Sequence, residues 1–173
     1  LRIIRFLEIV LNWVFRKIFS GVKTYNIERL RDAAKRYQVV YMPAHRSHFD
    51  YLLISYTLFK QGLLPPHIAA GVNLNFPPVG GILRRGGAFY IRRSFAGQPL
   101  YTAVFKTYLD VLLGKGYPVE FFPEGGRSRT GRLLKPKMGM LSMVVDSFIG
   151  QPNRKAAIVP VYIGYDKLVE SGS

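Results

Sequence analysis

From Gln38 onward, short apolar runs alternate with segments of helical periodicity, and this alternation constrains the fold more than any other feature. Strands that alternate with helices need crossover connections, which favour a parallel sheet covered on both faces. We therefore predict an α/β fold with a mostly parallel or mixed central sheet flanked by helices. The expected strands are 39–42, 68–70, 88–91, 118–122 and 157–163, and the expected helices are 50–60, 98–113 and 137–149. Pro160 cannot donate to a strand ladder, so it predicts that the last strand is irregular or lies at an edge.

The first part of the chain has a different pattern. Residues 1–19 predict an amphipathic helix whose polar face carries Arg2, Arg5, Asn12 and Arg16 and whose wide apolar face includes Trp13. This pattern fits two arrangements equally: a helix lying in a membrane interface, and a helix packed on the rest of the protein. A second helix is expected at 26–36. The sequence thus divides into an N-terminal helical segment, 1–36, and a larger domain, 37–173.

Composition limits the possible classes. The chain has 173 residues, enough for one domain with a core, and its lack of cysteine excludes disulfides, thiolate metal sites and a cysteine nucleophile. With 25 basic and 10 acidic residues the formal charge is +15, which attracts nucleic acid, anionic lipid, an acidic protein or a phosphorylated small molecule. No apolar run reaches the roughly 18–20 residues of a membrane span. Because the chain begins with Leu1 rather than methionine, we expect it to be a piece of a longer protein.

Unusual polar segments follow three of the expected strands. Residues 45–50 follow the first, Arg92-Arg93 follow the third, and residues 124–131 follow the fourth. Ligands of open α/β sheets bind at the carboxyl ends of the strands. If these strands are parallel, all three segments meet at one edge, and this convergence is the main indication of a site.

The first segment contains His45 and Asp50, which a strand-to-helix turn can bring together. The carboxylate would then orient the imidazole, whose other nitrogen would remove a proton from a hydroxyl group. The alternative is a loop histidine beside an aspartate that only caps the helix beginning near Tyr51.

Two further interpretations of this segment are weaker. Ser47 lacks the Gly-x-Ser-x-Gly context of a nucleophile elbow. A metal site would lack both a thiolate and a second ligand cluster; its candidate ligands would be His45, His48, Asp50 and His67.

The other two segments suggest anion binding. The planar guanidinium groups of Arg92 and Arg93 suit bidentate contact with phosphate, although such a pair can also simply solvate an edge. Gly125-Gly126 permits a tight turn whose amides approach an anion, with Arg127 adding charge, although it can also be an ordinary turn. Glu124, in this basic loop, would pair with an arginine or bind substrate hydroxyl groups.

Four blocks, in this order, resemble the motifs of the glycerolipid acyltransferase superfamily. They are His45-Arg-Ser-His-Phe-Asp50, Gly87-Ala-Phe-Tyr-Ile-Arg-Arg93, Phe122-Pro-Glu-Gly-Gly-Arg-Ser-Arg-Thr-Gly131 and Ile158-Val-Pro-Val-Tyr-Ile-Gly-Tyr165. Within the superfamily the chain resembles the membrane-bound bacterial glycerol-3-phosphate 1-O-acyltransferases. Lysophosphatidate acyltransferases usually have Asn before the histidine and Thr after the Glu-Gly pair, where this chain has Ala44 and Gly126.

The resemblance implies the glycerolipid acyltransferase fold for residues 37–173 and transfer of a fatty acyl group to the sn-1 hydroxyl of glycerol-3-phosphate. The donor would be acyl-CoA or acyl-ACP (acyl carrier protein), with no cofactor and no metal. It implies His45 and Asp50 as the catalytic pair, and amides near Gly125 as donors to the oxyanion. The implied substrate-binding residues are Arg92, Arg93, Glu124, Gly125, Gly126, Arg127, Ser128 and Pro160, the last shaping one wall.

The resemblance also implies contact with anionic lipids on the cytoplasmic side of the inner membrane, peripheral or monotopic, and no nucleic-acid partner. The competing functions are lysophosphatidate acyltransferase and a non-enzymatic basic domain that binds nucleic acid or anionic membranes.

Overall fold

A computed structural model describes residues 2–19, 21–92, 94–128, 130–151 and 153–165, with side chains from residue 8 onward. The described residues form a five-stranded sheet in the order β3-β2-β4-β1-β5. Every neighbouring pair of strands is parallel, which confirms the α/β prediction. The strands are β1 (Gln38–Pro43), β2 (His67–Gly71), β3 (Ala88–Ile91), β4 (Val119–Glu120) and β5 (Ala156–Val161).

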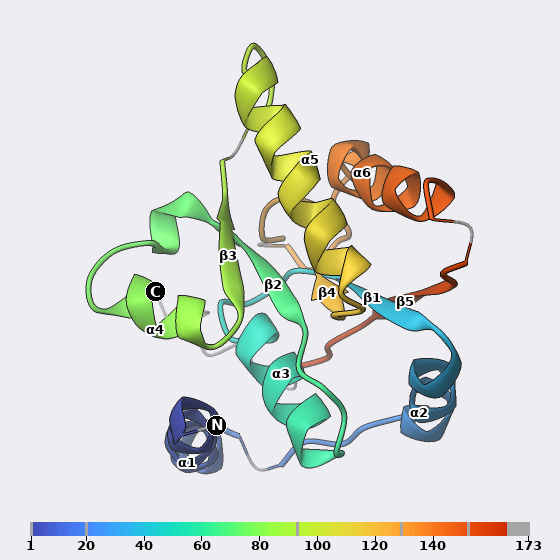
Figure 1. Ribbon diagram of the computed structural model, residues 1–173. Coiled ribbons are helices and arrows are strands. Elements are labelled where there is room, and N and C mark those ends of the chain that lie inside the picture. Colours follow the sequence, from blue (N-terminus) through green and yellow to red (C-terminus); the bar gives the residue numbers. More distant parts are fainter. Residues whose placement is uncertain (1, 20, 93, 129, 152, 166–173) are drawn as a thin grey trace.

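Helices cover both faces of this sheet (Figure 1). One face packs against α5 and α6, and the other packs against α3, with α1 lying on the far side of α3. The helices are α1 (Arg2–Ile18), α2 (Ile27–Arg36), α3 (Asp50–Lys60), α4 (Val79–Arg85), α5 (Pro99–Gly114) and α6 (Met138–Ile149), with a short 3-10 helix, η1 (Val72–Leu74).

The pleat of β1 divides the core in two. Val40 faces α5, where it packs near Leu109, whereas Val39 and Tyr41 face α3. Leu109 is fully buried, so its replacement by alanine would cost about 2–5 kcal/mol of stability. The second core fixes α3 against the sheet, and α3 carries the side chain of Asp50 at its first turn.

The helix α1 packs on the rest of the protein, which is one of the two arrangements that its sequence allowed. Its inner face packs on α3: Phe15 is buried against the ring of Tyr56, whose hydroxyl donates to Asn12 Oδ1 at 2.8 Å. Its outer face leaves Ile9 and Trp13 exposed, at 69% and 65%. The sequence predicted that Asn12 lies on the polar face of this helix with the arginines. In the structure it faces α3.

Within the described part of the chain, no helix has the length and apolar character needed to cross a bilayer.

Some boundaries differ from the prediction. The fourth strand, expected over 118–122, is only the two residues of β4, because the chain turns into the loop after Glu120. The helix α4 was not predicted, since its Gly80-Gly81 pair obscures helical periodicity. Pro160 does lie in an edge strand, β5, as expected.

Candidate active site

The carboxyl ends of the parallel strands bring the predicted segments to one edge of the sheet. His45 follows β1, Arg92 follows β3 and the 122–128 loop follows β4. A direct contact joins the first and the last of these, because Ser128 N–H donates to the carbonyl of His45 at 2.8 Å. The convergence expected from the sequence is therefore present.

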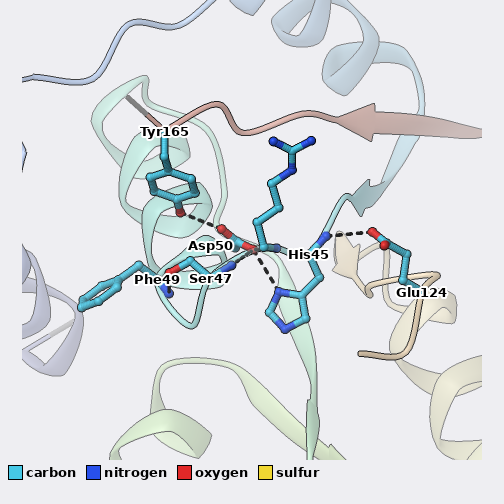
Figure 2. Close-up of polar contacts among 7 residues, drawn as sticks. His45, Ser47, Phe49, Asp50, Glu124 and Tyr165 are labelled. Carbon is cyan, nitrogen blue, oxygen red and sulfur yellow. Dashed lines mark hydrogen bonds and ion pairs between the residues drawn. The ribbon is translucent and has the colours of Figure 1, made fainter. Parts of the chain in front are cut away.

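His45 and Asp50 form a hydrogen-bonded pair (Figure 2). His45 Nδ1 lies 2.9 Å from Asp50 Oδ2. Because an ionised carboxylate only accepts, Nδ1 carries the proton and Nε2 keeps its lone pair. The imidazole also stacks on Phe122, with ring centroids 4.0 Å apart, and remains 15% exposed. The ring is thus held in one orientation and presents a basic nitrogen.

The carboxylate of Asp50 is fully buried yet well satisfied. Besides His45, its Oδ2 accepts from the backbone amides of Arg46 at 2.7 Å and Ser47 at 2.9 Å, and its Oδ1 accepts from Tyr165 Oη at 2.6 Å. Burial raises the pKa of Asp50, but these hydrogen bonds outweigh burial, so the net shift is downward. Asp50 is therefore an anion that stabilises a positive charge on His45.

This geometry rules out the capping alternative. The cap position of α3 belongs to Phe49, and Asp50 is the first helical residue. Its carboxylate binds the amides of Arg46 and Ser47, which precede the helix, and not those of the first helical turn. The sequence from His45 to Asp50 thus forms a compact turn around one carboxylate.

Glu124 supports the turn from the opposite side (Figure 2). Its Oε1 accepts from His45 N–H at 2.9 Å and its Oε2 accepts from Leu134 N–H at 2.7 Å, and the residue is 6% exposed. Ser128 is 3% exposed and its hydroxyl donates to the carbonyl of Arg132. Both side chains, which are expected from the sequence to bind substrate, form hydrogen bonds with the main chain.

The cavity beside His45 has a volume of about 770 Å³. At one end it is bordered by His45, Gly125, Gly126 and Arg127. From there it extends along α3, past Leu52, Tyr56 and Phe59, to Glu8 and Leu11 of α1. A polar end that holds the imidazole and a long apolar arm suit an amphipathic substrate.

The predicted basic residues differ in their positions. Arg92 borders the cavity, but its guanidinium donates to Gln98 and lies 4.7 Å from the centre of the Tyr101 ring. Arg127 also borders the cavity. Arg93 lies outside the described residues.

The glycine pair forms the expected turn. Gly125 has a φ of 63°, a backbone conformation that disfavours other residues. Its N–H donates to the carbonyl of Phe122 at 3.0 Å. The N–H of Gly126 has no such partner among the described residues, so it is the turn amide available to an anion.

Other candidates lie away from this cavity. Pro160 is exposed on β5 and does not border it, so it forms no wall of the cavity. Ser47 is 2% exposed and does not border it either. His67 begins β2 and so lies at the opposite edge of the sheet from His45. Across the described ranges, no group of three or more histidine or acidic side chains is placed to hold a metal ion.

Two side chains near the site were not singled out from the sequence. Tyr165 reaches Asp50 across 115 positions of sequence, and no local spacing signals such a contact. Lys137 borders the cavity directly before α6 and was only one member of a basic stretch. Their positions depend on the folded chain.

Comparison with known proteins identifies a matching family. The sequence model of the acyltransferase family matches residues 21–164. A protein of Ectopseudomonas mendocina (strain ymp) named glycerol-3-phosphate acyltransferase is 59% identical over 168 residues, which are 97% of this chain and 20% of that protein. One of the same name from Pseudomonas fluorescens (strain SBW25) is 59% identical over 167 residues, 96% of this chain and 20% of that protein.

The chain thus spans about a fifth of the length of the curated relatives that it matches. The family match, by contrast, covers most of the chain, including both members of the His45–Asp50 pair and the loop that packs against them. The chain belongs to the acyltransferase family.

Proposed function

We propose that the protein containing this chain transfers a fatty acyl group from a thioester, acyl-CoA or acyl-ACP, to the sn-1 hydroxyl of glycerol-3-phosphate. The observation that carries this proposal is the His45–Asp50 pair at the mouth of a long apolar cavity. The names of the relatives supply the acceptor, glycerol-3-phosphate.

In this reaction His45 acts as the general base. Its Nε2 accepts the proton of the acceptor hydroxyl while that oxygen attacks the thioester carbonyl. Asp50, ionised and hydrogen-bonded to Nδ1, stabilises the imidazolium that forms. When the tetrahedral intermediate collapses, the carbon–sulfur bond breaks, and the imidazolium returns the proton to the leaving thiolate. No covalent acyl-enzyme is needed.

The loop after β4 supplies the oxyanion donor in this scheme. Gly126 borders the cavity and its N–H has no backbone partner among the described residues, whereas the N–H of Gly125 is bonded to Phe122. A main-chain donor that needs no reorganisation is the usual means of stabilising a tetrahedral oxyanion. Glu124 holds the His45 main chain in this scheme.

The apolar arm of the cavity would take the acyl chain. It is lined by side chains of α3 such as Leu52 and Phe59 and ends against α1. Each buried methylene contributes about 0.8 kcal/mol, so a long chain would bind well there. Arg92, Arg93 and Arg127 remain the arginines proposed to attract phosphate groups of the substrates.

The outer face of α1 suggests where a membrane would lie. Ile9 and Trp13 are exposed there, and the last turn of the helix contains Arg16 and Lys17. Apolar and basic side chains together favour an anionic lipid surface. We propose peripheral contact at this face, on the cytoplasmic side of the inner membrane.

The test uses the full-length protein with an acyl-CoA donor and measures thiol release. We expect release that depends on glycerol-3-phosphate, with lysophosphatidate a poor acceptor. Release that depends on lysophosphatidate but not on glycerol-3-phosphate would replace the proposed acceptor, and no acceptor-dependent release would reject the proposal.

A further inference from the structure

An acceptor with a phosphate group needs positive charge close to His45. Arg92 and Ser128, two residues expected to supply phosphate contacts, already have partners within the protein. The Arg92 guanidinium donates to Gln98, and the Ser128 hydroxyl donates to the carbonyl of Arg132. A further cation at the cavity would fill this role.

Lys137 lies at the required place. Its backbone N–H donates to the carbonyl of Pro123 at 2.7 Å, which ties it to the loop that follows β4. Its side chain lies over Gly125: a methyl group on that glycine would be 2.9 Å from Lys137 Cδ and 3.3 Å from Nζ. The ammonium group is therefore held above the glycine turn, at the end of the cavity that His45 also borders.

The charge of Lys137 is not neutralised by a neighbour. Every ion pair among the described residues involves a cation other than Lys137. The Lys137 side chain forms no hydrogen bond with another described residue. An unpaired ammonium group beside a cavity attracts a compact anion, and its three donors suit the oxygens of a phosphate monoester.

We infer that Lys137 binds the phosphate group of the acceptor while His45 deprotonates its hydroxyl group; this inference rests on the proposed function. The donor acyl-CoA also carries phosphate groups, so the same chemistry has two sources. The acceptor is favoured, because Lys137 is bonded to Pro123, next to the Phe122 ring that packs on His45, and only a short carbon chain separates the phosphate of glycerol-3-phosphate from the hydroxyl group that reacts. Lys137 thus becomes a specificity-determining residue.

The test compares the full-length wild type with Lys137→Gln, Lys137→Arg and Lys135→Gln. Lys135 is a matched control, since it is an exposed lysine two positions earlier that does not border the cavity. Thiol release is measured while glycerol-3-phosphate and acyl-CoA are varied separately. Binding of glycerol-3-phosphate is followed in parallel by the shift in melting temperature, which also reports whether each variant is folded.

We expect Lys137→Gln to raise the KM for glycerol-3-phosphate about tenfold or more, as loss of one charge-assisted contact predicts. Its KM for acyl-CoA should stay within about twofold, Lys137→Arg should recover most of the loss, and Lys135→Gln should match the wild type. The melting-temperature shift should weaken only in Lys137→Gln.

Two results would overturn the inference. One is an unchanged KM for glycerol-3-phosphate together with an unchanged binding shift; the other is a rise confined to the KM for acyl-CoA, which would assign Lys137 to the donor. A wild type without glycerol-3-phosphate-dependent release rejects the proposed function instead, and the binding shift then still decides whether Lys137 holds the phosphate.

Discussion

At the residue scale, the site is built around the carboxylate of Asp50. A buried anion is costly, and here its cost is offset by donors from three different sources: the imidazole of His45, the backbone of Arg46 and Ser47, and the hydroxyl of Tyr165. Only the last of these comes from a distant part of the chain. Tyr165 therefore links the segment after β5 to the His45–Asp50 pair.

Replacing Tyr165 by phenylalanine tests this link. The change removes the donor to Asp50 Oδ1, so the carboxylate is less firmly held and its pKa rises. We expect kcat to fall about tenfold with little change in KM. A misaligned base stabilises the transition state less well, whereas substrate binding does not depend on its alignment. Steady-state kinetics of the full-length variant measure both.

The control for Tyr165→Phe is Tyr90→Phe. The Tyr90 hydroxyl donates to the carbonyl of Gly80 at 2.9 Å, away from Asp50. The Tyr90→Phe variant should lose this hydrogen bond but keep the kcat of the wild type. Equal effects of the two substitutions on kcat would mean that Tyr165 has no positioning role.

Only some of the contacts in this site could be predicted from the sequence. The spacing of His45 and Asp50 predicted their contact, because five positions across a strand-to-helix turn bring the two side chains together. Glu124 was expected to bind an arginine or substrate, and its actual partners are backbone amides of His45 and Leu134. A backbone amide exists at almost every position, so no residue type in the sequence identifies it as a partner.

At the element scale, strand β4 places an acid inside the sheet. Glu120 is fully buried on the α3 side, and neither of its carboxyl oxygens has a hydrogen-bond partner among the described residues. Burial, with the charge of Asp50 as a lesser cause, raises the pKa of Glu120 well above its ordinary value. Burial, and to a lesser extent Glu120, raises the pKa of the adjacent Tyr41 to about 12. Glu120 is thus protonated and neutral inside the folded core.

Glu120→Gln should change the dependence of stability on pH. A folded-state pKa above the unfolded one stabilises the protein below the unfolded value, and this contribution disappears as pH rises through the folded value. Over the pH range above the ordinary pKa of a glutamate, the wild type should therefore lose stability as pH rises, whereas the glutamine variant should not show this loss. Melting temperatures of both full-length proteins across this range measure the difference, and parallel curves would refute it.

Helix α1 supports a prediction about the membrane. Replacing Ile9 and Trp13 by serine removes its two most exposed apolar side chains among the described residues while leaving the inner face on α3 intact. We expect the full-length variant to co-sediment less with anionic vesicles, because buried apolar area drives interfacial binding. Leu100→Ser, at a residue of α5 that is 78% exposed, is the control. Equal sedimentation of variant and wild type would contradict the assignment of this face.

The elements themselves were predicted unevenly. Helices with a long apolar pattern, such as α5, begin and end within one residue of the predicted limits, because the helical period is repeated several times. The sequence left the environment of α1 open between a membrane interface and the rest of the protein, because it cannot show that Phe15 and Asn12 meet α3. Short elements rich in glycine, such as α4, carry too little pattern to predict.

At the scale of the whole molecule, the parallel sheet determines where chemistry occurs. Parallel order was predicted from the alternation of strands and helices, and it necessarily gathers the segments after the strands at one edge. The cavity was not predicted, because it is a space between α1, α3 and the loops, and its shape depends on all of them. Its course from His45 to α1 connects the proposed catalytic pair to the helix proposed to meet the membrane.

The central claim is that His45 is the base of an acyl transfer. The most direct measurement is kcat of the full-length His45→Ala variant for acyl-CoA and glycerol-3-phosphate, beside His67→Gln, which changes a histidine at the opposite edge of the sheet. Loss of a general base predicts a fall in kcat of about 100-fold to 10,000-fold with an unchanged KM for glycerol-3-phosphate, and near-normal turnover of His67→Gln. A His45→Ala enzyme that turns over at a rate close to the wild type would contradict the account.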